Sequence, residues 1–196
     1  MQIESLHSGG LREPRPDLEN DVRARLIAEL TDLLRRSGRE IAAAPADAPT
    51  NSSTSPAAPR LAAEADARAL LAAVHEAIVT HHVRYRHRRE LDYAVGDAAR
   101  TLCDAEFDAA LVASLQAAVP TGGRSALQAA GLAMSAVTQS FVYVPTHEAA
   151  LTLMLIDADG EVLWFGFAAG AVDVLSDSGL RRLVRAAGRR LLHEEK

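Results

Sequence analysis

Three carboxylates with spacing that could serve metal binding, Asp157, Asp159 and Glu161, lie in the segment LIDADGEVLWFG. An EF-hand calcium loop needs oxygen ligands at positions 1, 3, 5 and 12 around a glycine at position 6. With Gly160 at position 6, positions 1 and 12 are a leucine and a glycine. Because both end ligands are missing, the sequence does not support a calcium site.

The same segment predicts the turn of a β-hairpin. An Asp-Gly pair between two apolar runs is a strong hairpin signal, because glycine adopts positive φ without steric cost. We expect the side chain of Asp157 to accept a hydrogen bond from the backbone N–H two residues on. Trp164 and Phe165 are neighbours on the second strand and therefore face opposite sides. One should fill the core, and the pair is our candidate contact with a protein partner.

A cluster of histidines, His81, His82 and His87, lies in the stretch HHVRYRHRRE, which ends at Glu90. Zinc-binding helices use two histidines four residues apart beside an acid, in the pattern HExxH, and that spacing is absent here. A solvated basic segment fits the stretch better. A small metal-dependent hydrolase that uses these three histidines is the alternative hypothesis.

The arginines of this stretch are candidate contacts for an anion. They are Arg84, Arg86, Arg88 and Arg89. The chain as a whole carries a formal net charge of −5, and no nucleic-acid-binding motif accompanies the cluster. We therefore expect no nucleic acid partner, and a cytoplasmic regulatory domain that binds anions is a further alternative.

The remaining nucleophiles lack the partners that catalysis requires. Cys103 is the only cysteine, so no intrachain disulfide forms, and its place on an apolar helix face predicts a buried thiol. Ser125 follows TGGR, which is neither a G-x-S-x-G elbow nor a P-loop. We expect no catalytic residue, no bound metal and no cofactor, and hence a protein that is not an enzyme.

Hydrophobic periodicity predicts the elements that would position these residues. We expect a strand at 3–7, a helix from Asp17 to Gly38, a flexible Ala/Pro/Ser-rich loop at about 42–60, a helix from Leu61 into 81–90, a short helix at 98–103, a strand at 108–116, a helix at 121–137, a strand at 141–144, two strands flanking the Asp-Gly turn, and a final helix capped by Ser176 or Asp177. This order predicts an α/β (α+β) fold within a single domain, 1–196: a mixed β-sheet with helices packed on it, and a C-terminal β-hairpin followed by a final helix.

Composition narrows the class of protein further. Hydrophobic residues make up 48% of the 196 residues, which suits a globular core, but aromatics are only 4%. No apolar run reaches the roughly 18 residues of a membrane span. The start, MQIESLHSGG, lacks the apolar region of a signal peptide, which leaves open a cytoplasmic protein or one whose leader precedes this sequence.

Five phrases together resemble an uncharacterised family of proteobacterial envelope lipoproteins. They are SGGLREPRPD, LDYAVGDAARTL, EFDAALVASL, TGGRSALQAAGLAM and LMLIDADGEVLWF. The domain of that family is similar to the periplasmic α/β domains of the curli secretion channel and of the TolB N-terminus. The chain departs from the family pattern at Leu18, where an aromatic is expected, and at Gly166, where a polar residue is expected. It also lacks the lipobox cysteine, for which Cys103 is no substitute.

The resemblance implies a non-catalytic envelope component, either periplasmic or associated with the outer membrane. As a binding or assembly module it would engage a protein partner or a second copy of itself. Contact with a membrane would come only through an anchor that is not present in this chain. The alternative location is the cytoplasm.

Overall fold

The computed structural model of the chain describes residues 1–7, 11–38, 57–80, 94, 100, 102–103, 107–122, 147–189 and 191. Within these residues lie five strands and three long helices. They are β1 (Gln2–Leu6), β2 (Arg12–Pro14), α1 (Pro16–Arg36), α2 (Ala57–Thr80), β3 (Ala109–Pro120), β4 (Glu148–Asp157), β5 (Val162–Gly170) and α6 (Asp177–Ala187).

The described strands form one mixed sheet in the order β2-β1-β3-β4-β5. Strand β1 pairs antiparallel with β2 and parallel with β3, with Ile3 opposite Ala117. A mixed sheet with helices, a C-terminal hairpin and a final helix is the α/β fold class that the sequence predicts, so this prediction is confirmed.

The chain divides into two compact units. The first consists of Met1–Leu33, Leu115–Leu151 and Phe167–Arg189, and the second of Leu34–Ser114, Thr152–Gly166 and Arg190–Lys196. Because β3, β4 and β5 each contribute residues to both units, this division does not decide the expectation of a single domain, which stays a prediction.

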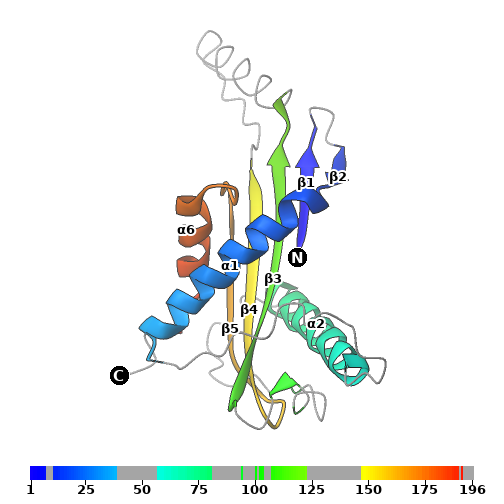
Figure 1. Cartoon of the computed structure of the whole chain (residues 1–196), viewed down its shortest axis with the longest axis vertical. Coiled ribbons are helices and arrows are strands. Elements are labelled where there is room, and N and C mark those ends of the chain that lie inside the picture. The colour runs from blue at the N-terminus through cyan, green and yellow to red at the C-terminus, as the bar shows by residue number, and fades with distance from the viewer. Residues whose placement is uncertain are drawn as a thin grey trace. The chain divides into compact units, whose positions relative to one another are not determined.

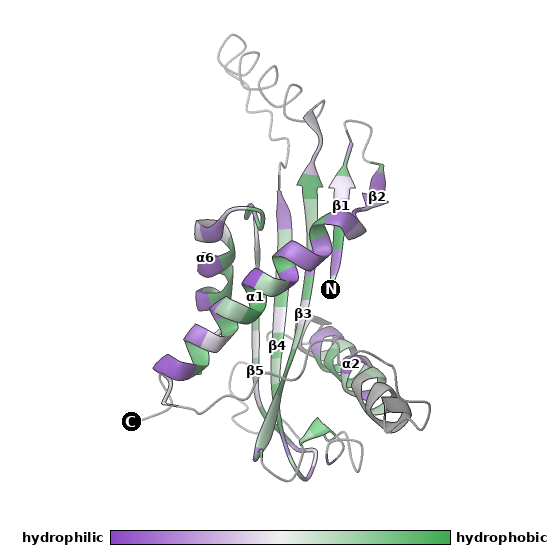
Figure 2. Ribbon diagram, viewed as in Figure 1, coloured by the Kyte–Doolittle hydropathy of each residue, from purple (hydrophilic) through white to green (hydrophobic). Residues whose placement is uncertain are grey.

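In the first unit, α1 runs across strands of the sheet and α6 lies beside it (Figure 1). The helix α1 buries a stripe at helical spacing that includes Val22, Leu26 and Leu30. The helix α6 is purple on one side and green on the other in Figure 2, since its arginines and its apolar residues lie on opposite sides. The apolar side is buried and the arginines are exposed. The two helices approach closely at Gly188, where an added Cβ would press on Leu33.

The start of α6 is fixed by a side-chain cap. Ser176 has extended backbone angles, and its Oγ accepts a hydrogen bond from the Gly179 N–H at 3.1 Å, as the N-cap pattern predicts. Gly179 is buried, and a Cβ at that position would collide with the carbonyl oxygen of Asp173. The sharp entry into α6 therefore requires both the serine and the glycine.

In the second unit, α2 packs against the part of the β4–β5 hairpin that lies nearest its turn. Ala67, Leu71 and Val74 of α2 form one buried cluster with Met154, Ile156 and Val162. Thr152 is buried as well, and its Oγ1 lies 3.2 Å from Nδ1 of His75. The predicted burial of Cys103 is confirmed, since only 5% of this residue is exposed.

Three boundaries differ from those predicted. The strand predicted at 108–116 runs on to Pro120 as β3. The helix α2 begins at Ala57, inside the expected loop, because alanines favour a helix and Pro59 is tolerated in a first turn. The strand β2 forms between the predicted strand at 3–7 and the predicted helix from Asp17, where no strand was predicted, since β1 supplies its pairing partner. Predicted features at 42–56, 81–90, 123–137 and 141–144 lie outside the described residues, as does most of the short helix at 98–103.

Candidate interaction surfaces

The acidic turn between β4 and β5 has the geometry of a braced hairpin. Oδ1 of Asp157 accepts hydrogen bonds from the backbone N–H groups of Asp159 at 3.0 Å and Glu161 at 2.8 Å. Gly160 has a φ of 88°, and its N–H donates to the Asp157 carbonyl at 3.1 Å. The predicted hairpin is confirmed. Within the described residues, no group of three or more histidine, cysteine or acidic side chains is arranged to hold a metal ion.

The predicted contact pair lies mostly inside the second unit. Trp164 is only 5% exposed, so it is the member of the pair that fills the core, and the role of the pair as a partner contact stays a prediction. The reason is strand phase: Val162, Trp164 and the glycine at 166 face inward. Phe165 is half-buried and packs against the cluster under α2. One residue of the pair fills the core, as the sequence suggested.

The exposed apolar side chains of β5 are instead Leu163 and Phe167, with exposed fractions of 53% and 38%. Both have odd numbers, and alternating residues of a strand share a face. The sequence could not reveal this phase, because VLWFGF is apolar at nearly every position.

The two edge strands of the described sheet differ in chemistry. At one edge, β2 has three residues, Arg12, Glu13 and Pro14, all exposed, and it is purple in Figure 2. Arg12 pairs with Glu148 at 2.8 Å and with Glu4 at 3.6 Å. Short length, charge and proline are the devices by which proteins protect sheet edges from pairing.

At the other edge, β5 has nine residues with the sequence VLWFGFAAG and contains neither a charge nor a proline. Among the described strands, none pairs with its outer side. An isolated antiparallel bridge joins Ala94 to Glu161, the residue before the strand begins. Within the described sheet, β5 is therefore an edge strand that lacks the protective features of β2.

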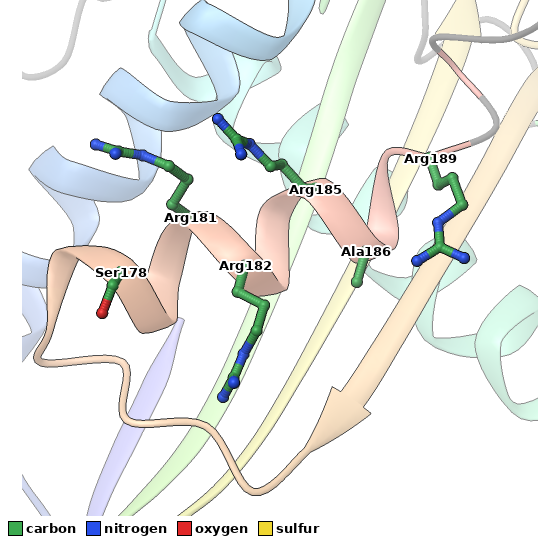
Figure 3. A pocket seen from close by; sticks show the side chains of 6 residues that line it. All are labelled: Ser178, Arg181, Arg182, Arg185, Ala186 and Arg189. Atoms are coloured by element: carbon green, nitrogen blue, oxygen red, sulfur yellow. The ribbon is translucent and has the colours of Figure 1, made fainter.

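A charged surface lies at α6, the arginine face, which consists of Arg181, Arg182, Arg185 and Arg189 (Figure 3). The first three lie on the helix within a sector of roughly 100°, and Arg189 follows the C-cap Gly188. Together with Ser178 and Ala186 they line a shallow hollow of about 430 Å³. In Figure 3 the guanidinium groups spread around the helix rather than converge, which suits an extended anionic surface better than one small anion.

Only one of these arginines has an ion-pair partner within the described part of the chain. Nε of Arg181 lies 3.0 Å from Oε1 of Glu29 on α1. The sequence shows the arginines as the polar side of an amphipathic helix. It does not show which of them an acidic neighbour neutralises, because that neighbour lies about 150 residues away in the chain.

Ser5, His7 and Glu13 have the residue types of a hydrolase triad. However, Ser5 Oγ at 3.3 Å and Glu13 Oε2 at 3.1 Å both approach Nε2 of His7. A triad uses one ring nitrogen for the serine and the other for the acid. These contacts therefore join β1 to β2 without forming a proton relay.

An exposed ion pair stands at the start of α1. Nε and Nη2 of Arg15 donate to the two carboxylate oxygens of Asp17 at 2.8 and 2.6 Å. These hydrogen bonds lower the pKa of Asp17 below its ordinary value and raise the pKa of Arg15. The shift arises from a bidentate surface pair at a helix N-terminus, where a carboxylate is favoured, and it indicates no catalytic role.

The other predicted site residues lie outside the described residues. These are His81, His82, His87 and Ser125, and the candidate anion contacts Arg84, Arg86, Arg88 and Arg89. Their roles stay predictions.

None of the described helices is long and apolar enough to cross a membrane. No family model, curated protein or solved structure matches the chain.

Proposed function

We propose that this chain is a non-catalytic binding or assembly module that engages a protein partner along strand β5. The observation that carries this proposal is the contrast between the two sheet edges. The strand β2 combines the protective features of a closed edge, whereas the nine residues of β5 carry none of them. An unprotected edge that is retained in a folded protein is suited to accept another strand.

The physical basis for such binding is strand addition. A partner strand gains affinity from main-chain hydrogen bonds and specificity from alternate side chains. The strand β5 offers both, since its outer backbone groups have no partner strand in the described sheet and Leu163 and Phe167 project exposed apolar surface.

We place this module in the periplasm or at the outer membrane. Support for this location is the resemblance of the five sequence phrases to envelope lipoproteins. A direct test is to locate the start of the native open reading frame, since a leader with a lipobox would exclude the cytoplasm.

The interaction is tested by photo-crosslinking in intact cells. A photoreactive benzoylphenylalanine in place of Leu163 should yield a defined adduct. The matched control is the same group in place of Ile27, which is 44% exposed on α1. Leu163→Lys should abolish binding of the partner because it places a charge on the edge, whereas Ile27→Lys should leave binding unchanged. An adduct of equal yield from both positions, or a partner that survives Leu163→Lys, would contradict the proposal.

A second candidate function, binding to an anionic surface, is favoured by the arginine face of α6. Near an anionic surface each arginine contributes about 1 kcal/mol, or roughly a fivefold change in affinity. Arg182→Gln and Arg185→Gln should each reduce retention on anionic vesicles by that factor, whereas Arg23→Gln on α1 should not. If all three variants behave alike, only net charge matters and the arginine face is not a site.

A further inference from the structure

We infer that Glu29 of α1 is a positioning residue of the arginine face, and that it orients Arg181 to bind a phosphate of an anionic phospholipid surface. This inference rests on the second candidate function and names both its ligand and a residue that orders the site. Three observations support it: the atoms through which Glu29 and Arg181 pair, the burial of the carboxylate, and the row that Arg181 forms with Arg185. All three residues belong to the first compact unit.

The ion pair occupies only one edge of the Arg181 guanidinium. Its Nε lies 3.0 Å from Oε1 and 3.3 Å from Oε2 of Glu29. An arginine commonly pairs with a carboxylate through two of its nitrogens, as a fork. Here both carboxylate oxygens share a single N–H, and within the described part of the chain no hydrogen bond or ion pair occupies Nη1 or Nη2. The two terminal nitrogens are therefore left to form a fork with an anion.

The two partners differ in burial. The side chain of Glu29 is 17% exposed, whereas that of Arg181 is 50% exposed. A surface that approaches α6 would therefore contact the guanidinium rather than the carboxylate. Since Glu29 already restricts the long arginine side chain in the free protein, less side-chain entropy is lost when an anion binds.

Arg181 and Arg185 form a row along α6. They are four residues apart, about one helical turn, and in Figure 3 their guanidinium groups point to the same side of the helix while that of Arg182 points away. Like charges at this spacing destabilise a helix. Phosphate groups that accept hydrogen bonds from both guanidinium forks would relieve this repulsion.

The exposed side of α6 suits a flat bilayer surface. The side chains of Ser178 and Ala186, which line the hollow together with the arginines, are small and allow close approach. No large apolar side chain of α6 is exposed, so attraction to headgroup phosphates rather than insertion would provide the binding energy. The acidic Asp177 at the start of the helix is paired with Nη1 of Arg25 at 3.3 Å.

The positioning role is tested by two variants of equal charge, Glu29→Gln and Glu29→Ala, in the full-length chain. The probe is binding to vesicles of phosphatidylglycerol and phosphatidylcholine in equal parts, at fixed ionic strength. Only glutamine keeps an oxygen that can accept the hydrogen bond from Nε of Arg181. We expect Glu29→Gln to bind about threefold more tightly than Glu29→Ala, within the roughly fivefold that one arginine contributes. In an Arg181→Gln background the two variants should bind alike, because the residue that Glu29 orients is gone.

A third variant, Glu29→Asp, keeps the charge but shortens the side chain by one methylene. It should bind about threefold more weakly than the unsubstituted chain, and it serves as a second comparison if Glu29→Ala does not fold. Equal binding by Glu29→Gln and Glu29→Ala, or tighter binding by Glu29→Ala, would mean that net charge alone matters and would overturn the positioning role.

The ligand and the underlying function are tested separately. Binding of the unsubstituted chain to soluble polyphosphate but not to the vesicles would overturn the phospholipid surface as ligand. If Arg182→Gln, Arg185→Gln and Arg23→Gln all bind the vesicles alike, the second candidate function fails and this inference fails with it. If Arg182→Gln and Arg185→Gln weaken binding as expected and only the Glu29 variants coincide, the function stands and the positioning role alone is wrong.

Discussion

The contribution of the Asp157 side chain to the β4–β5 turn can be measured directly. Asp157→Ala deletes the acceptor of two backbone hydrogen bonds, at 3.0 and 2.8 Å, and leaves the backbone bond to Gly160 in place. Each such bond contributes about 1 kcal/mol net, so the free energy of unfolding should fall by about 2 kcal/mol. For a chain of this length that corresponds to a Tm lower by about 4–8 °C.

The matched control is Asp157→Asn, whose side-chain oxygen can still accept both hydrogen bonds. It should cost less than half as much as the alanine variant. The assay is thermal and urea unfolding followed by circular dichroism, repeated with and without millimolar calcium. Equal losses in the two variants, or a Tm of the unsubstituted chain that rises with calcium, would refute the assignment of Asp157 to turn bracing and point back to ion binding.

Three other predictions test the fold. Ser176→Ala removes the cap of α6 and should cost about 1 kcal/mol in urea unfolding, whereas Ser176→Asp should retain most of that stability. Trp164→Phe should be close to neutral in thermal unfolding, because the buried indole N–H has no hydrogen-bond acceptor in the described structure, whereas Trp164→Ala should cost about 3–5 kcal/mol. The pKa of Asp17 is lowered in the folded state, so its contribution is present above the ordinary value of 3.8 and is lost as the pH falls through the folded pKa. The stability difference between the unsubstituted chain and Asp17→Asn should therefore shrink between pH 5 and about pH 2.

The elements that the sequence predicted well have strong local signals. The helix α6 combines an apolar stripe with a serine cap, α1 combines one with acidic residues in its first turn and basic residues in its last, and the hairpin carries an Asp-Gly pair. Local sequence determines such features because the hydrogen bonds involved join residues only a few positions apart.

The features that were missed depend on partners distant in the chain. Three residues with a proline have no strand periodicity, and β2 exists because β1 offers an edge beside it. Trp164 and Phe165 are both apolar, so only the packing of α2 and its neighbours decides which one is buried. Likewise, Glu29 neutralises Arg181 but not the other arginines of α6, which no local pattern reveals.

The short edge strand β2 also limits how far the described sheet could be extended by added strands. Strand addition at both ends of a sheet would allow unlimited growth, as in a fibril. In the described sheet, Arg12, Glu13 and Pro14 protect the β2 end, so strand addition would be confined to the β5 end. Growth of the sheet in both directions would therefore be prevented.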